Sequence, residues 1–252
     1  MTLKRIVRAI LPTKISWALG SIRMLYRERR LRRLSLPQAF NEVYRKGMWQ
    51  QGQSLSGIGS EGLLAERYVA FVREYIREGR IKTIVDAGCG DFNVGSRLCG
   101  DVSACIALDA SSYIIDANQK RYADISNVSF QVADLVVTTF PPADLILIRQ
   151  VLQHLTNDQI ERVLTNLDHS EWDRVLVTEA VADPSNDANA NLDLQSHSVR
   201  TRVNFGSGVF IDRPPFNRPA KRIAVIDDAS PGKEASSRLL VFELTKRQTT
   251  AQ

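Results

Sequence analysis

The run Thr-Ile-Val-Asp-Ala-Gly-Cys-Gly-Asp-Phe at residues 83–92 constrains the fold of this chain more than any other segment. Its apolar start predicts a buried strand over 82–87, and Gly88 and Gly90 predict a sharp turn into a helix expected at about 93–100. Because glycine has no Cβ, a ligand can rest against the main chain there, facing the free N–H groups of the next helix. A nucleotide-like cofactor suits such a turn.

A second acidic residue makes the cofactor more definite. The apolar run at 104–108 ends in Asp109, about twenty residues after the glycine turn. A carboxylate at the tip of the second strand is where a Rossmann-type site hydrogen-bonds the hydroxyls of an adenosyl ribose. The third residue after Gly90 is Asn93 and not a glycine, which argues against the dinucleotide-binding fingerprint.

These residues resemble the class I S-adenosylmethionine-dependent methyltransferases over roughly residues 64–167. The resemblance depends on the turn from Asp86 to Gly90, on Asp109, and on the Val-Ala-Asp run that ends at Asp134 after a third strand. It implies S-adenosylmethionine as the cofactor. Its methionine part would lie over the turn formed by Asp86, Gly88 and Gly90, its ribose would bind Asp109, and its adenine amino group would lie beside Asp134.

The apolar pattern predicts a doubly wound, Rossmann-like α/β fold with a seven-stranded sheet. Helices are expected over 61–78, 111–121 and 157–167, the last capped by Thr156 or Asn157. Strands are expected over 82–87, 104–109, 128–132, 144–149 and 174–179, followed by an end pair over 222–226 and 238–244. We expect a basic helical extension over 1–48 and a methyltransferase domain over 49–252. A lid-like insertion over about 183–216, containing His197, Arg200 and Asn204, would set the acceptor.

The segment after the fourth strand is expected to carry the chemistry, because ligands of an open parallel sheet bind outside the carboxyl ends of its strands. This places Arg149, Gln150 and His154 near the sulfonium, with Gln150 at the cofactor. Methyl transfer mainly requires alignment, and a base is needed only for a protonated acceptor. His154 is the candidate base, or else only bonds the backbone. Arg149 is a candidate to bind an anionic group of the acceptor, or it pairs with Glu179, which ends the fifth strand.

Two further segments extend the resemblance to a mostly uncharacterised group of class I methyltransferases. They are Trp49 with the loop Ser-Leu-Ser-Gly-Ile-Gly-Ser at 54–60, and a late Asn204 followed by Pro-Pro-Phe at 214–216. Ser56 and Gly57 are candidates to fold over the cofactor's carboxylate, unless the loop is an ordinary linker. Gln150 stands where an acidic residue is common in that group, which weakens any catalytic role for a carboxylate there. Phe92 stands where many class I members carry a third glycine, so we expect a tighter turn.

Positive charge is concentrated at the N-terminus. Residues 1–36 contain ten Lys or Arg and one acid, a net charge of +9, so the whole-chain charge of +5 leaves −4 for the other 216 residues. Apolar residues recur at helical spacing between the basic ones, which would let this segment lie on an anionic membrane surface. The alternatives are a helix packed on the domain, an organellar transit peptide and a nucleic-acid arm. No signal peptide is evident.

Composition fits a cytoplasmic, possibly membrane-associated enzyme. At 252 residues and 44% hydrophobic, the chain can bury one substantial core. The three cysteines show no metal-ligand spacing, so we expect a reducing compartment and no metal. Nucleic acid is disfavoured because the core is acidic. The sequence therefore predicts a methyltransferase acting on a small molecule or a glycan or lipid-linked precursor. The alternative is a catalytically inactive S-adenosylmethionine-binding module that acts as a partner or regulator.

Overall fold

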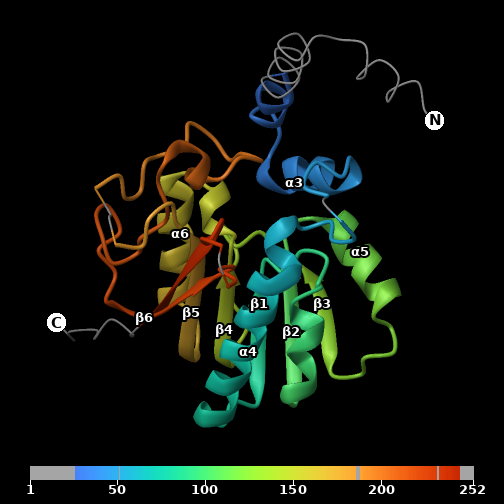
Figure 1. The fold of residues 1–252 in the computed structure, drawn as a ribbon. Coiled ribbons are helices and arrows are strands. Elements are labelled where there is room, and N and C mark those ends of the chain that lie inside the picture. Colours follow the sequence, from blue (N-terminus) through green and yellow to red (C-terminus); the bar gives the residue numbers. More distant parts are fainter. Residues whose placement is uncertain (1–25, 51, 186–187, 232, 245–252) are drawn as a thin grey trace, which may run out of the picture.

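The computed structural model describes residues 26–50, 52–185, 188–231 and 233–244, which form a seven-stranded sheet in the order β3-β2-β1-β4-β5-β7-β6 (Figure 1). The strands β1 to β5 are parallel, and β7 runs antiparallel between β5 and β6. The expected doubly wound sheet is confirmed. Both ends of every strand lie within two residues of their predicted positions. The bounds are β1 Thr83–Ala87, β2 Ala104–Asp109, β3 Val128–Val132, β4 Ala143–Arg149, β5 Trp172–Ala180, β6 Ala220–Asp227 and β7 Arg238–Leu244.

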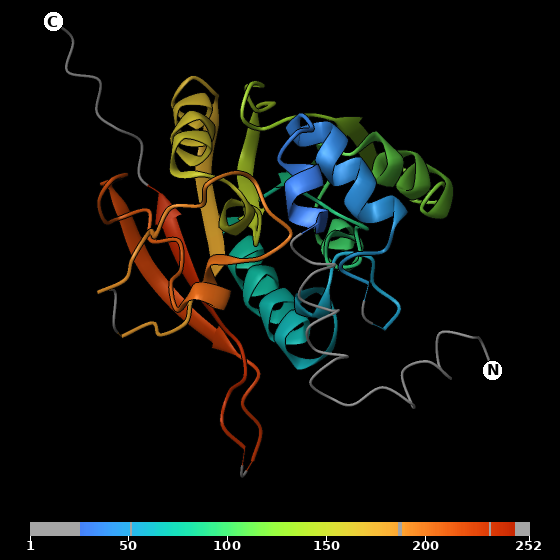
Figure 2. The same cartoon turned by 90° about the horizontal axis from the view of Figure 1, so that it is seen from above.

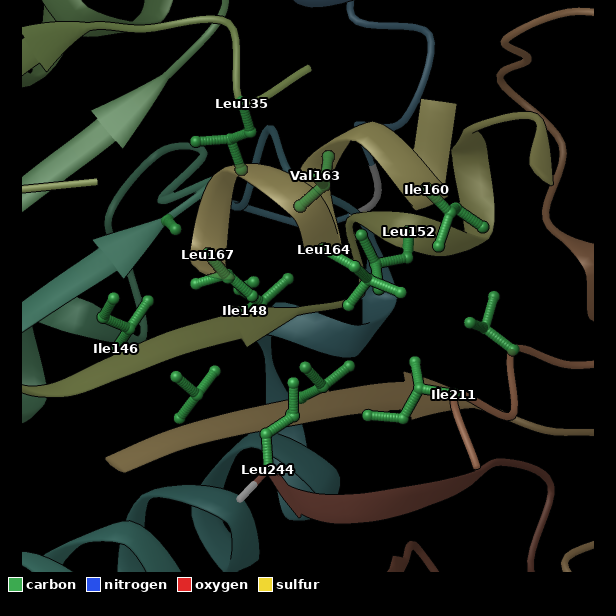
Figure 3. Packing of buried hydrophobic residues seen from close by; sticks show 14 of the residues in the cluster. Leu135, Ile146, Ile148, Leu152, Ile160, Val163, Leu164, Leu167, Ile211 and Leu244 are labelled. Carbon is green, nitrogen blue, oxygen red and sulfur yellow. The ribbon is translucent and has the colours of Figure 1, made fainter. Parts of the chain in front are cut away.

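Helices cover both faces of the sheet, which explains why β1 and β4 are apolar on both sides. The helix α4 (Gly62–Gly79) packs on one face through Leu64, Tyr68 and Val72. The helix α6 (Asn157–Asp168) packs on the other, where its apolar side chains meet Ile146 and Ile148 of β4 (Figure 3). The helix α5 (Ser112–Arg121) lies beside β2 and β3.

The predicted cap of α6 is confirmed. The Thr156 hydroxyl accepts a hydrogen bond from the Gln159 N–H at 3.2 Å, and the Gln159 side chain accepts one from the Thr156 N–H at 3.0 Å. Two N–H groups that the helix leaves unpaired are thereby satisfied, as in a capping box.

The helix expected over 93–100 is wrong. The chain makes two short 3₁₀ turns there, Gly95–Arg97 and Cys99–Asp101. Phe92 adopts a φ of +58° and buries its ring against Tyr122 and Phe130, with centroid distances of 5.3 and 5.0 Å. A Cβ at Gly95 would collide with that ring, so the segment folds around the Phe92 side chain and not as a regular helix.

The helix α3 (Leu36–Arg45) lies above the carboxyl ends of the first strands, as both views show (Figures 1 and 2). The Asn41 side chain ties it to the start of α5, because its oxygen accepts hydrogen bonds from the Ser111 hydroxyl at 2.8 Å and the Tyr113 N–H at 3.0 Å. Leu36 and Phe40 pack on the core beneath it. Part of the predicted extension 1–48 therefore covers the sheet edge, while the domain boundary itself stays a prediction.

The apolar pattern predicted over residues 3–22 lies outside the described residues. Within the described part, no helix combines the length and apolar character that a bilayer crossing requires.

The segment 183–216 contributes to the core. Val209, Phe210, Ile211 and Phe216 are buried with the α6 cluster. The Asn191 side chain fixes this part of the segment, because its oxygen accepts from the Phe210 N–H and its nitrogen donates to the Phe210 carbonyl, both at 2.8 Å. The second half of the predicted insertion is thus packed structure.

Candidate cofactor and active site

A cavity opens under α3 at the carboxyl ends of the parallel strands and encloses about 1070 Å³ of unfilled space including its mouth. Most of the predicted cofactor residues line it: Asp86, Gly88, Gly90, Asp109, Asp134, Gln150 and Ser56, together with the predicted catalytic pair Arg149 and His154. Gly57 does not line it. The described segments therefore bring nearly all the candidate site residues to one place, as expected for the strand ends of such a sheet.

The glycine turn needs its glycines for close packing. Gly88 and Gly90 have φ values of +84° and +55°. A Cβ at Gly88 would collide with the Val151 side chain, and one at Gly90 would collide with the Ser56 hydroxyl. The turn is thus enclosed by the segment after β4 and by the serine and glycine loop, and it still borders the cavity.

Asp109 is fixed at the tip of β2. Its two carboxylate oxygens accept hydrogen bonds from the Gly90 N–H at 3.0 Å and the Ser111 N–H at 2.8 Å. Burial raises the pKa of Asp109 to about 6, although both N–H donors favour the charged form. Asp134 lies further along the same wall, beside Leu135 and Val136. These carboxylates are placed to accept from hydroxyl and amino groups of a ligand.

The serine and glycine loop is fastened to the glycine turn by Asp91. The Asp91 carboxylate accepts from the Ser54 hydroxyl at 2.8 Å and the Leu55 N–H at 2.7 Å. In return, the Asp91 N–H donates to the Ser56 hydroxyl at 2.8 Å. At the far end of the loop, the Asn93 side chain donates to the Ser60 carbonyl at 2.6 Å. The loop is therefore a wall of the cavity.

Arg149 and Asp86 lie on the floor of the cavity. The Arg149 guanidinium is stacked over the Tyr68 ring of α4 at 4.8 Å and donates to the Gly59 carbonyl. Burial raises the pKa of Asp86 to about 7, while the charge of Arg149 opposes the rise.

Glu179 does not pair with Arg149, so that alternative is wrong. Its carboxylate accepts instead from the N–H groups of Val151 at 3.0 Å, Leu152 at 2.8 Å and Gln153 at 3.2 Å. Glu179 therefore shapes the segment after β4, where Gln150 turns with a φ of +54°.

Aromatic side chains form the remaining part of the cavity. Trp49 packs on His154 with a centroid distance of 4.7 Å and a tilt of 36° between the rings, and Phe40 contacts both rings. The Trp49 indole N–H donates to the Val199 carbonyl at 3.0 Å. His154 Nδ1 lies 3.0 Å from the Ser198 carbonyl, and because a carbonyl only accepts, this nitrogen carries the proton. Nε2 is then left with a lone pair.

Burial lowers the pKa of His154 to about 4. The imidazole is therefore neutral at pH 7.

The predicted lid residues lie elsewhere. Among the described residues of 183–216, none lines the cavity. His197 Nε2 lies 3.2 Å from the Leu31 carbonyl, Arg200 lies 3.8 Å from Glu28, and Asn204 caps the turn that starts at Thr201. The segment acts indirectly, because its carbonyls at Ser198 and Val199 hold His154 and Trp49.

Sequence reasoning missed Phe40, Tyr44, Tyr68 and Asp91, all of which line the cavity. Leu36, Phe40 and Tyr44 recur every four residues behind Ser35 and mark an apolar helix face, which is the signal that could have found two of them.

The described residues contain no cluster of His, Cys, Asp and Glu suited to a metal ion. The three cysteines are free thiols.

Comparison with known proteins relates this chain to methyltransferases. Residues 84–170 match a family model described as a methyltransferase domain. No curated protein sequence matches the chain. The N-methyltransferase NodS from Bradyrhizobium japonicum WM9, in complex with S-adenosyl-L-homocysteine, is 15% identical with a TM-score of 0.59, over 81% of this chain and 99% of that chain. Magnesium protoporphyrin IX methyltransferase (ChlM) from Synechocystis PCC 6803 with bound SAM is 14% identical with a TM-score of 0.55, over 83% and 95%. At these identities the likeness shows the fold.

Proposed function

Since this chain carries a class I S-adenosylmethionine-dependent methyltransferase domain, we propose that it methylates an uncharged group of a small molecule, or of a glycan or lipid-linked precursor, bound against the aromatic side chains of the cavity. One observation carries the proposal. A single cavity joins the glycine turn, Asp109 and Asp134 to the ring cluster of Phe40, Trp49 and His154.

The cofactor half of the cavity follows the order of the strands. Asp134 follows β3, Asp109 ends β2 and the glycine turn follows β1, so an adenosyl group would extend along this edge. The ribose hydroxyls would donate to Asp109, which already has two N–H donors to orient it. Asp134 would accept from the adenine amino group.

The acceptor half carries no full charge among its described lining residues. Leu36, Phe40, Trp49, Gln153 and Leu155 line it, and His154 is neutral at pH 7. Aromatic faces bind planar rings and the apolar faces of sugars through buried contact area. We therefore assign the acceptor to uncharged molecules that present a flat or apolar face.

Methyl transfer at this site is an in-line displacement. The acceptor heteroatom forms a bond to the methyl carbon while the carbon–sulfur bond breaks, and the electron pair of that bond stays on sulfur to give S-adenosylhomocysteine. For a hydroxyl acceptor, the proton would pass to His154 Nε2, which has a lone pair because Nδ1 carries the proton; the Gln153 side-chain amide, 3.5 Å from Nε2, would turn away from it. The low pKa of His154 returns that proton readily to water. The protein mainly aligns the two reactants.

The basic N-terminal segment is proposed to contact an anionic membrane surface. In its described part, Arg27, Arg29 and Arg33 are exposed around a helical stretch at 26–31. Each basic side chain near an anionic surface contributes about 1 kcal/mol. Flotation with vesicles of phosphatidylserine and phosphatidylcholine should retain the protein, and replacing these three arginines by glutamate should abolish retention. Equal retention on phosphatidylcholine alone would contradict the proposal.

The test of the activity is methyl transfer from methyl-labelled S-adenosylmethionine to a cell extract, separated into small-molecule, lipid, nucleic-acid and protein fractions. We expect label in the small-molecule or lipid fraction. His154→Gln should retain cofactor binding and lose most of the transfer, whereas the exposed His169→Gln should behave as wild type. Cofactor binding without label in any fraction would instead indicate the inactive binding module.

A further inference from the structure

Arg149 is a buried cation that Asp86 and Glu179 affect electrostatically without forming an ion pair with it. Among the described residues, no carboxylate lies within ion-pair distance of it, although it borders a cavity rich in aspartate. Its guanidinium lies over the Tyr68 ring at 4.8 Å, and within the described part of the chain it donates one hydrogen bond, to the Gly59 carbonyl. Its Nε makes no hydrogen bond and is buried. An unpaired buried charge is costly unless a ligand completes it.

Tyr68 adds a second incompletely satisfied donor on the same floor. It is 1% exposed and lines the cavity, and its hydroxyl interacts with the Thr178 hydroxyl but makes no hydrogen bond of normal geometry among the described residues. Arg149 at the end of β4 and Tyr68 of α4 thus bring two incompletely satisfied buried donors to the floor of the cavity. Their natural partner is an anion with at least two oxygens, because a guanidinium binds a carboxylate with several N–H groups at once.

The charges of the cavity identify this anion. Its described lining contains four aspartates, at 86, 91, 109 and 134, and Arg149 is the one permanent cation. S-adenosylmethionine carries two positive groups, the sulfonium and the ammonium, and one negative group, the carboxylate of its amino-acid end. With the adenosyl part along β2 and β3, this end reaches the neighbouring strands β1 and β4, where Asp86 and Arg149 lie.

We propose that Arg149 and the hydroxyl of Tyr68 bind the carboxylate of the cofactor, with Asp86 facing its ammonium group. This assignment rests on the proposed function and replaces the acceptor-binding role that the sequence predicted for Arg149. The carbonyl of Gly59 holds the guanidinium in place, so the serine and glycine loop contributes to the same subsite through its main chain. Arg149 and Tyr68 thus select ligands that carry an intact amino-acid end.

The test compares two ligands that differ in this end. S-adenosylhomocysteine carries the carboxylate and the ammonium, whereas 5′-methylthioadenosine keeps the adenosyl and sulfur parts and lacks both groups. Isothermal titration of the full chain gives a dissociation constant for each. Wild type should bind S-adenosylhomocysteine more tightly than methylthioadenosine. Arg149→Met should raise the dissociation constant for S-adenosylhomocysteine about 30-fold or more. It should change the dissociation constant for methylthioadenosine by about twofold or less.

Two further variants separate binding from structure. Tyr68→Phe keeps the ring under the guanidinium and removes the hydroxyl. It should therefore raise the dissociation constant for S-adenosylhomocysteine about three- to tenfold and leave that for methylthioadenosine unchanged. Arg174→Met removes a similar stack, with the guanidinium 5.5 Å from the Tyr75 ring, outside the cavity, and should bind both ligands as wild type does.

Three results overturn the assignment. Unchanged binding of S-adenosylhomocysteine to Arg149→Met means that Arg149 does not contact the carboxylate. An equal loss for both ligands means that Arg149 only supports the fold. Equal affinity of wild type for both ligands means that no amino-acid subsite exists. Failure of wild type to bind either ligand would instead contradict the proposed function itself.

Discussion

Glu179 should control both the stability of the chain and the shape of the segment that carries His154. Its carboxylate is completely buried at the end of β5 and accepts from three consecutive N–H groups, those of Val151, Leu152 and Gln153. These donors belong to a 3₁₀ turn whose own pattern leaves them unpaired. Glu179→Ala removes all three acceptors at once.

The size of the effect follows from the hydrogen bonds. A buried donor left without an acceptor costs about 1–3 kcal/mol. Three donors at the low end of that range give about 3 kcal/mol, a large share of the stability of a typical domain. Glu179→Gln keeps one oxygen, which can serve Val151 and Leu152, and turns an NH₂ group toward the Gln153 N–H. The loss of one acceptor should lower the free energy of unfolding of Glu179→Gln by about 1–2 kcal/mol.

Urea unfolding followed by circular dichroism measures both losses. The exposed Glu78→Gln on α4 is the matched control, and its free energy of unfolding should lie within about 0.5 kcal/mol of wild type.

Burial raises the pKa of Glu179 from 4.5 to about 8, so the native state binds a proton that the unfolded state has lost. The stability that Glu179 contributes is therefore complete below about pH 4.5 and falls as the pH rises toward 8. The gap between wild type and Glu179→Gln should narrow over this range, and a gap that widens would refute the reasoning.

Three other perturbations test the remaining parts of the site. Burial raises the pKa of Asp109 to about 6, and ribose hydroxyls donate to its charged form, so affinity for S-adenosylhomocysteine should fall up to about tenfold per unit below pH 6. Asp109→Asn should bind weakly at all pH values, and a variant that keeps the wild-type pH dependence would exclude this role. Asp91→Asn breaks part of the contact with the loop 54–60 and should lower the affinity for the cofactor about three- to tenfold, whereas the exposed Asp173→Asn should leave it unchanged. Limited proteolysis of the loop should be faster in Asp91→Asn. Trp49→Phe keeps a ring and loses the bond to the Val199 carbonyl, so the KM for the acceptor should rise while cofactor affinity stays, and the reverse pattern would place Trp49 at the cofactor.

The strands were predictable because each is a short apolar run between turn residues, and because their order follows from the pairing of a doubly wound sheet. The failure at 93–100 has a local cause. That segment contains Gly95 and Gly100, which weaken a helix, and its path depends on where the Phe92 ring packs. Ring packing of this kind is a tertiary contact that periodicity does not record.

The cofactor wall of the site was predictable because Asp109 and Asp134 follow strands that end at one edge. The acceptor wall was not, because Phe40 reaches the cavity from a helix inside the basic N-terminal segment. Tertiary contacts place that helix over the strand ends, namely the hydrogen bonds of Asn41 with the start of α5 and the packing of Leu36 and Phe40 on the core. The partner of Glu179 was equally hidden, since the main-chain donors it binds have no side-chain signature.

Calorimetric titration of the full chain with S-adenosylhomocysteine tests most directly whether the cavity under α3 holds the adenosyl cofactor. We predict saturable binding of one molecule per chain, which is lost in Asp109→Ala while that variant still unfolds cooperatively. Absence of binding to a wild-type chain that unfolds cooperatively, or undiminished binding to Asp109→Ala, would contradict the account.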